Sequence, residues 1–103
     1  MKIKDVKPGM RSITLIGKVI EKGKPSEVFT KFGPAIHTTA ILQDDTGKIL
    51  LNLWRNQVSA VQVGDTVKIE GAFSKIYRGI LEINIGRTGS IKVLRRGHVE
   101  KTT

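Results

Sequence analysis

The sequence predicts an all-β fold, a five-stranded Greek-key barrel of the OB class with one short helix between the third and fourth strands. Five segments alternate apolar and polar residues, which is the pattern of a strand with one buried face. Only residues 55–63 form a plausible helix, and they lie between the third and fourth of these segments. Gly17 and Gly71 interrupt two segments and would let their strands bend sharply, as a small closed barrel requires.

The first half of the chain is predicted to form three strands. In the first, Ile13, Leu15 and Val19 occupy alternate positions. The next segment contains two glycines and two prolines, so we expect a loop or a hairpin arm rather than a core strand. A tight Asp-Asp-Thr-Gly turn then joins the second and third strands as a hairpin. The expected bounds are 11–21 for the first strand, 22–34 for the loop, and 35–43 and 48–54 for the next two strands.

The second half is predicted to complete the barrel. Valines of the helix would close one end, and Ile3 and Val6 would pack against an end as well. In the last strand, alternation directs Glu82 and Asn84 outward. We expect the fourth strand at 66–73, a loop at 74–79, the fifth strand at 80–85 and a basic turn at 86–89, with a possible strand end from residue 91. One domain is expected at 1–93, followed by a basic tail at 94–103 that frays.

The charge of the chain favours a polyanionic partner. Its 103 residues include 18 Lys and Arg against nine Asp and Glu, for a formal charge of +9. Nucleic acid is therefore the first candidate partner. An anionic membrane surface is the alternative, but no basic amphipathic helix is visible that could lie on it, so no membrane partner is expected. Without a signal-peptide pattern or a long apolar run, a cytoplasmic, nucleoid-associated protein is expected.

No cofactor, metal or enzymatic activity is expected. The chain has no cysteine, and His37 and His98 lie far apart in sequence. The pair Asp44-Asp45 could suggest metal or acid–base chemistry, but no further His, Cys or acid converges on it, so a role in the turn is favoured. Residues 17–24 superficially resemble a phosphate-binding loop, but the glycine spacing is wrong and Pro25 replaces the required Ser or Thr.

Aromatic residues and cations lie close together in the second half of the chain. Flat rings can stack on bases, and Lys and Arg can hold phosphates. Three of the five aromatic residues follow this pairing: Trp54 precedes Arg55, Phe73 is followed by Lys75, and Tyr77 precedes Arg78.

Packing in the core is the alternative for each ring, since most isolated aromatic residues are buried. Alternation argues against it for Trp54, because Leu51 and Leu53 share the opposite face. Tyr77 lies in a polar, glycine-terminated stretch that we expect to be a loop. For Phe29 and Phe32 two interpretations stay open: one of them covers the mouth of the barrel, or one adds a stacking surface.

Several short motifs occur in a specific order between Val6 and Ile91. They are Lys7-Pro8-Gly9-Met10, Thr30-Lys31-x-Gly33, Asp44-Asp45-Thr46-Gly47, Leu51-x-Leu53-Trp54, Gly64-Asp65, Phe73-x-x-x-Tyr77-Arg78-Gly79 and Gly86-Arg87-x-Gly89. Together they resemble the short, single-OB single-stranded DNA-binding proteins of archaea and their eukaryotic relatives in the sensor-of-single-strand complex. The last motif is similar to the eukaryotic branch in particular.

The resemblance implies that Trp54, Phe73 and Tyr77 stack on bases. Phe73 stands where the family often has Trp or Tyr, which keeps the ring but loses a hydrogen-bond donor. Asn84 stands where the eukaryotic relatives carry a further aromatic residue, and Phe32 could partly replace it.

The sequence therefore predicts sequence-tolerant binding of single-stranded DNA by a monomer, in replication, recombination or repair. An RNA-binding OB domain and a structural, protein-binding OB subunit are the alternatives. The predicted stacking residues are Trp54, Phe73, Tyr77 and Phe32; the predicted phosphate contacts are Lys31, Arg55, Lys75, Arg78 and Arg87; and the further predicted nucleic-acid contacts are Thr30, Asn52 and Asn84.

Overall fold

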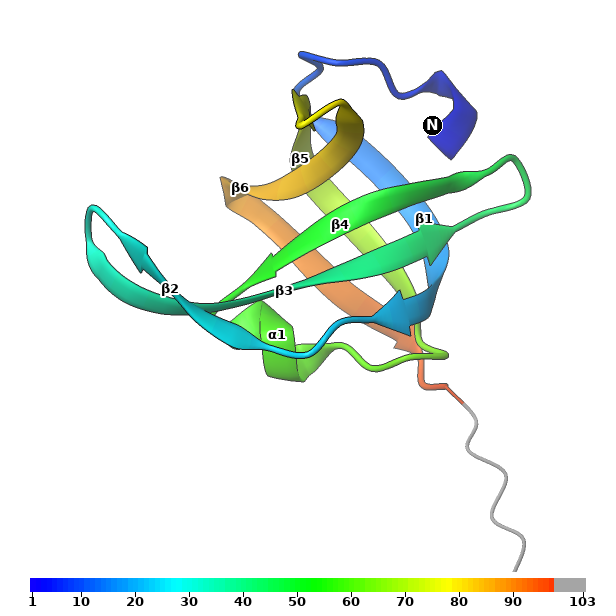
Figure 1. Cartoon of the computed structure of the whole chain (residues 1–103). Coiled ribbons are helices and arrows are strands. Elements are labelled where there is room, and N and C mark those ends of the chain that lie inside the picture. Colours follow the sequence, from blue (N-terminus) through cyan, green and yellow to red (C-terminus); the bar gives the residue numbers. More distant parts are fainter. Residues whose placement is uncertain (98–103) are drawn as a thin grey trace, which may run out of the picture.

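Six strands curl into a closed sheet in the computed structural model, which describes residues 1–97 (Figure 1). The elements in chain order are the 3-10 helix η1 (Ile3–Asp5), β1 (Ile13–Lys22), β2 (Ser26–Thr30), β3 (Gly33–Gln43), β4 (Lys48–Trp54), the helix α1 (Asn56–Ala60), β5 (Thr66–Tyr77) and β6 (Ile80–Arg95). The predicted all-β barrel is confirmed, and its short helix lies where it was expected, now between β4 and β5.

The strand order is β1-β5-β6-β4-β3-β2, and an additional pairing between β1 and β3 closes the barrel. Neighbouring strands run antiparallel, except that β4 and β6 are parallel from Leu50 opposite Glu82 to Asn52 opposite Asn84. Strand β2 pairs with β3 alone, so it lies outside the closed ring and extends β3 into a hairpin arm.

Alternation along the strands builds the core. The predicted inward positions Ile13, Leu15 and Val19 of β1 are at most 1% exposed. Burying an aliphatic side chain of this kind is worth about 1.5–3 kcal/mol, so alternation is the main determinant of which face turns inward. Ile3 and Val6 are both buried in this core, as the sequence predicts.

The predicted loop at 74–79 is too long and the predicted turn at 86–89 is wrong, because β5 and β6 continue through these residues. Residues 74–77 belong to β5, so only Arg78 and Gly79 turn the chain. Residues 86–89 belong to β6, which crosses close over β5. A Cβ added at Gly89 would lie 2.6 Å from the carbonyl oxygen of Glu70, so glycine is needed there for the close approach of two strands and not for a turn.

The end of β6 is fixed to the junction between α1 and β5. The carboxylate of Asp65, which is 1% exposed, accepts hydrogen bonds from the amides of Gln62 (2.9 Å) and Gly97 (2.7 Å) and from Arg96 Nη1 (3.1 Å). Burial raises the pKa of Asp65, but these hydrogen bonds and the charge of Arg96 outweigh it and lower the pKa below its ordinary value. Strand β6 therefore runs past residue 93, to Arg95. The division into a domain and a fraying tail stays a prediction, and residues 98–103 lie outside the described part of the chain.

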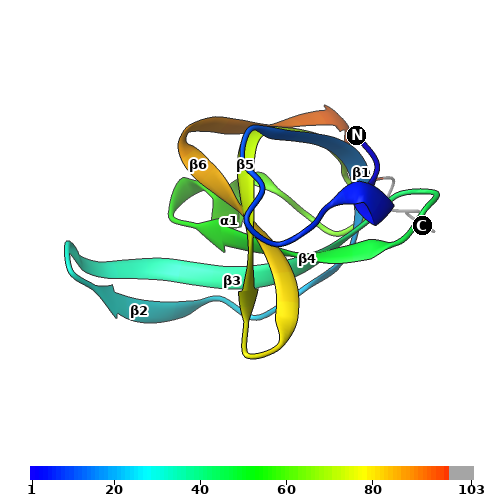
Figure 2. The same ribbon diagram turned by 90° about the horizontal axis from the view of Figure 1, so that it is seen from above.

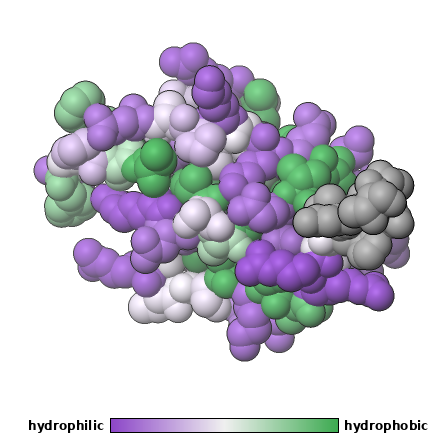
Figure 3. All heavy atoms as spheres, turned by 90° about the horizontal axis from the view of Figure 1, so that it is seen from below, coloured by the Kyte–Doolittle hydropathy of each residue, from purple (hydrophilic) through white to green (hydrophobic). Residues whose placement is uncertain are grey.

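Two hairpins project from the barrel in different directions (Figure 2). One is formed by β2 and β3, and the other by the end of β5 and the start of β6. Hydrophobic atoms are exposed at the end of the molecule where the β2–β3 hairpin lies (Figure 3). Phe29 and Phe32 of this hairpin are 80% and 77% exposed, so neither covers a mouth of the barrel.

Within residues 1–97, the structure has no helix that is long and apolar enough to cross a membrane.

Candidate nucleic-acid interface

Strand register brings predicted site residues from separate strands onto one outer face of the sheet. His37 of β3 lies opposite Trp54 of β4, and Asn52 of β4 lies opposite Asn84 of β6. Asn84 in turn lies opposite Phe73 of β5. Residues that pair across strands share a face, and so do residues two positions apart in one strand. Trp54, Asn52, Asn84 and Phe73 therefore form a band across three neighbouring strands, with His37 beside it.

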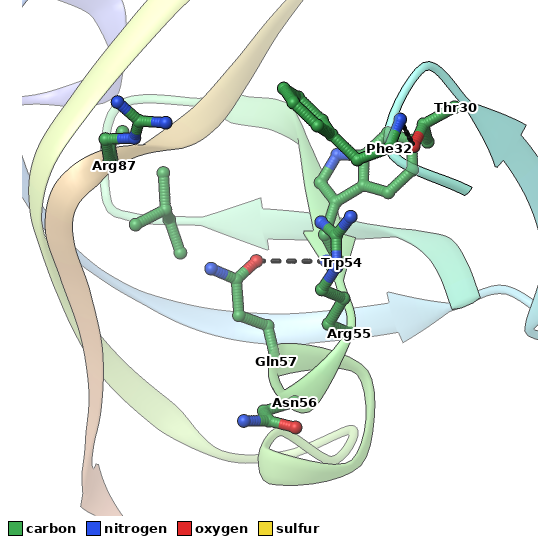
Figure 4. A pocket seen from close by; sticks show the side chains of 9 residues that line it. Thr30, Phe32, Trp54, Arg55, Asn56, Gln57 and Arg87 are labelled. Carbon is green, nitrogen blue, oxygen red and sulfur yellow. Dashed lines mark hydrogen bonds between the residues drawn. The ribbon is translucent and has the colours of Figure 1, made fainter. Parts of the chain in front are cut away.

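The indole of Trp54 lies on this face and is partly exposed, whereas Leu51 and Leu53 on the opposite face are fully buried. Its ring centroid lies 4.2 Å from that of His37, with the planes tilted by 41°. The backbone amide of Trp54 donates a hydrogen bond to Gln57 Oε1 at 3.0 Å (Figure 4). The ring is thus supported on one side and open on the other.

An open groove with a volume of about 470 Å³ lies beside the indole. We call it the Trp54 groove; it is lined by Thr30, Phe32, Trp54, Arg55, Asn56, Gln57, Ile85, Gly86 and Arg87. Figure 4 shows Phe32 and Trp54 on one side of it and Arg87 on the other. Its lining includes two guanidinium groups and no carboxylate, which suits an anionic, ring-bearing ligand.

A second groove, of about 410 Å³, adjoins the first and shares Gly86 and Arg87 with it. We call it the Phe73 groove; its lining is Arg11, Ser12, Gly71, Ala72, Phe73, Gly86, Arg87 and Thr88. It too is lined by two arginines and no carboxylate. Phe73 is 37% exposed and is the only aromatic residue that lines it.

The tip of the β2–β3 hairpin presents Phe32 at the rim of the Trp54 groove. Thr30 shapes this turn, because its hydroxyl donates to the carbonyl oxygen of Gly33 (2.7 Å) and accepts from the amide of Phe32 (3.1 Å). Lys31 Nζ lies 5.4 Å from the centroid of the Phe32 ring, within reach of a cation–π interaction. Lys31 itself lines neither groove.

Tyr77 lies at the tip of the β5–β6 hairpin, apart from both grooves. Phe73, Lys75 and Tyr77 alternate along β5 and therefore share its outer face. The Tyr77 ring is 53% exposed, with Lys75 Nζ 5.9 Å and Arg78 Cζ 5.3 Å from its centroid. Although the predicted loop is a strand here, the ring is exposed because the hairpin extends beyond the barrel.

Asn52 and Asn84 lie on the outer face, as predicted, but they are only 6% and 8% exposed. Asn52 Oδ1 lies 2.8 Å from His37 Nε2, and Asn84 Oδ1 accepts from Trp54 Nε1 at 3.4 Å. The Nδ2 atoms of both amides are buried and have no hydrogen-bond partner among the described residues. Glu82 was also predicted to point outward into solvent, but it is buried between neighbouring strands, with 6% of its surface exposed.

Sequence reasoning missed His37 and Arg11. The register of the β3–β4 hairpin would have found His37: counting away from the turn, where Gln43 pairs with Lys48, places His37 opposite Trp54. Nothing in the sequence brings Arg11 and Phe73 into one groove, because this depends on how β1 and β5 pair.

Asp44 and Asp45 serve the turn and the N-terminal segment. Asp44 accepts hydrogen bonds from the amides of Thr46 (2.7 Å), Gly47 (3.1 Å) and Ile3 (2.8 Å). Burial raises the pKa of Asp44, but the hydrogen bonds from Thr46, Ile3 and Gly47 outweigh it and lower the pKa to about 2. Among residues 1–97, no group of three His, Cys, Asp or Glu side chains could hold a metal ion.

Comparison with known proteins identifies the fold and its relatives. A family model described as "Single-stranded DNA binding protein Ssb-like, OB fold" matches residues 6–93. The chain is 32% identical over 85 residues to the single-stranded DNA binding protein Ssb of Saccharolobus solfataricus, covering 82% of this chain and 57% of that protein. It is 30% identical over 80 residues to replication factor A of Methanothermobacter thermautotrophicus, covering 77% of this chain and 10% of that one. The chain thus spans little more than half of the first relative and a tenth of the second.

Solved structures confirm the OB class. The OB domain of Ta0387 from Thermoplasma acidophilum superposes with a TM-score of 0.80 at 22% identity, over 99% of this chain and 92% of that one. A domain of replication protein A from Methanococcus maripaludis superposes with a TM-score of 0.76 at 26% identity, over 93% of this chain and 96% of that one.

Proposed function

This chain belongs to the family of Ssb-like single-stranded DNA-binding proteins with an OB fold, and we propose that it binds single-stranded DNA across the outer face of β3, β4, β5 and β6. Bases stack on the exposed rings of Trp54, Phe73, Tyr77 and Phe32, and nearby cations hold the phosphates. Every base has a flat face, so this mode of binding tolerates any sequence.

The observation that carries the proposal is the Trp54 groove. Its wall is a partly exposed indole, its rim carries a further ring, Phe32, and its charged groups are the guanidinium groups of Arg55 and Arg87. Each stack of a base on an aromatic ring is worth about 1–3 kcal/mol, so a few stacks suffice for micromolar affinity or better.

The remaining cations flank this path. Lys31 lies beside Phe32, and Lys75 and Arg78 lie beside Tyr77. If about three phosphates are neutralised, the slope of log K against log salt is near −2, since each contact contributes about −0.7 on a single strand. Duplex DNA binds more weakly, because its paired bases cannot reach the rings. Asn52, Asn84 and Thr30 contribute polar contacts or hold the rings in place.

Titration of Trp54 fluorescence with oligo-dT tests this function. Trp54 is the only tryptophan of the chain, so quenching reports on this ring alone. We expect quenching that saturates with oligo-dT and weakens with salt. Unchanged fluorescence, together with no shift of a labelled oligo-dT, would contradict the proposal and favour a protein-binding subunit. Competition between matched dT and U oligomers then distinguishes a DNA-binding protein from an RNA-binding one.

We further propose that the protein acts in the cytoplasm, in DNA replication, recombination or repair, as a monomer without enzymatic activity. Its similarity to Ssb and to replication factor A supports such a role.

A further inference from the structure

The Phe73 groove contains a cation that the proposed stacking path does not use. Arg11 lies just before β1, is exposed, and lines this groove together with Arg87. Apart from the two arginines and Phe73, the lining consists of small residues, among them Ala72 and Gly86. Two guanidinium groups beside a surface with no carboxylate form a place where a phosphate can be held by several hydrogen bonds.

The two grooves adjoin at Gly86 and Arg87, which line both of them. Gly86 has no side chain to stand between them. A Cβ at this position would lie 2.7 Å from the carbonyl oxygen of Gly71 and 3.9 Å from Phe73 Cδ1. The close approach of β5 and β6 therefore requires glycine at position 86. Because glycine has no side chain, none projects from this position where the two grooves meet.

Arg11 is held on a rigid support. The segment before β1 is hydrogen-bonded to Ser74, the residue next to Phe73. The amide of Gly9 donates to the carbonyl oxygen of Ser74 (3.0 Å), and the amide of Ser74 donates to the carbonyl oxygen of Met10 (3.0 Å). Met10 also donates its amide to Ser74 Oγ at 3.0 Å. Arg11 follows directly, and its position relative to Phe73 is thus set by the backbone rather than by a mobile loop.

The backbone on the far side of Arg11 is also unusual. Ser12 has a φ of +54°, which a residue with a side chain seldom adopts. Only two other non-glycine residues in the described chain have a positive φ, Arg55 beside Trp54 and Arg78 beside Tyr77. For Arg78 this is the ordinary geometry of a two-residue hairpin turn with Gly79. Ser12 and Arg55 lie in no such turn and line the Phe73 and Trp54 grooves, and strained backbone concentrates at functional sites.

We propose that the bound strand continues from the Trp54 groove into the Phe73 groove, where Arg11 and Arg87 together hold the phosphate of the nucleotide that stacks on Phe73. This inference rests on the proposed function and adds a phosphate contact at the start of β1 that the sequence did not suggest. It also predicts that oligonucleotides which reach only the Trp54 groove do not contact Arg11.

Salt titration of three variants tests the contact. Loss of one phosphate contact on a single strand makes the log–log salt slope shallower by about 0.7, which is about a fivefold loss of affinity near 0.1 M salt. We expect this change for Arg11→Ala with a labelled oligo-dT of about 12 nucleotides, within the range of OB-fold site sizes. Arg11→Lys keeps the charge and should keep the slope. Lys92→Ala removes one exposed cation that lines neither groove, and it should match the native protein.

A length series places the contact. With oligo-dT of about 4 nucleotides, the short end of OB-fold site sizes, Arg11→Ala and the native protein should bind equally, and the difference should appear only as the oligomer lengthens. Equal salt slopes for Arg11→Ala and the native protein at every length would overturn the inference and leave the proposed function standing. A loss of affinity that is the same at every length would overturn it too, because Arg11 would then act by its general charge. If the native protein binds no oligo-dT, the proposed function itself fails. Circular dichroism and the Tm establish that each variant is folded.

Discussion

Trp54 Nε1 donates a hydrogen bond to Asn84 Oδ1 at 3.4 Å, and this contact joins β4 to β6 across the outer face of the barrel. Asn84 is 8% exposed, and its Nδ2 has no partner among the described residues. The same amide therefore orients the indole and leaves a buried donor unpaired. Its role is better explained by the position of the ring than by the stability of the fold.

Asn84→Leu should separate these two effects. The change removes the acceptor for Trp54 Nε1, so the indole loses part of its orientation and oligo-dT affinity should fall about fivefold, as expected for one hydrogen bond of about 1 kcal/mol. Because the variant also removes an unpaired buried donor, its free energy of unfolding should be equal to that of the native protein or higher. Urea unfolding measures the free energy of unfolding, and titration with labelled oligo-dT measures the affinity. A variant that is clearly less stable would show that Asn84 serves the fold.

Trp54→Ala should weaken the binding of oligo-dT by the value of one stack, about 1–3 kcal/mol or roughly 5-fold to 150-fold. Fluorescence anisotropy of a labelled oligomer measures it, since the variant has no tryptophan. Trp54→Phe keeps a ring and should recover most of the affinity. A loss below about threefold for the alanine variant would remove Trp54 from the stacking residues.

Asp44 should make stability depend on pH in acid. Its pKa is about 2 in the folded protein, against an ordinary value of 3.8. A carboxyl group with a depressed pKa stabilises the fold fully above its unfolded pKa, and this contribution is lost as the pH falls from about 4 through about 2. Asp44→Asn should show a smaller fall of Tm over this range, and it should be less stable than the native protein near pH 7. Parallel Tm curves for the two proteins would contradict this assignment.

Asp65 and Arg96 form an ion pair whose two sides should contribute very unequally. Arg96 is 67% exposed and Asp65 is 1% exposed. Arg96→Ala removes a surface charge and should cost at most about 1 kcal/mol. Asp65→Ala leaves the amides of Gln62 and Gly97 without their acceptor and should cost about 2–4 kcal/mol. Urea unfolding measures the loss of unfolding free energy in each variant. Equal losses for Arg96→Ala and Asp65→Ala would show that the ion pair contributes more than the hydrogen bonds to the amides.

Local pattern alone predicted much of the barrel. Alternation placed β4 at Lys48–Trp54, the bounds that the structure has, and turned Trp54 away from Leu51 and Leu53. The Asp-Asp-Thr-Gly turn predicted the β3–β4 hairpin, because its side chains and glycine act within four consecutive residues. These features depend on neighbours in sequence, so the sequence carries them directly.

The path of β5 and β6 could not be predicted in the same way. In the sequence Gly89 ends a predicted turn and Gly71 marks a predicted bend within a strand, yet a Cβ on Gly71 would lie 2.7 Å from Gly89 Cα. Glycine allows a turn and also a close crossing of two strands, and only the pairing partner determines which of these occurs. The predicted turn at 86–89 was wrong for this reason. The predicted loop at 74–79 was too long for a different one: residues 74–77 pair with the start of β6 and continue β5, so only Arg78 and Gly79 turn the chain.

By itself, then, the sequence determined the all-β class, the basic charge, and that the ring of Trp54 turns away from the core, because these follow from the residue and its nearest neighbours. Only the tertiary structure decided that Asn52 and Asn84 are buried although they lie on the outer face, and that Arg11 and Phe73 line one groove. Each of these arrangements brings together segments that are distant in sequence, and it exists only once the barrel has closed.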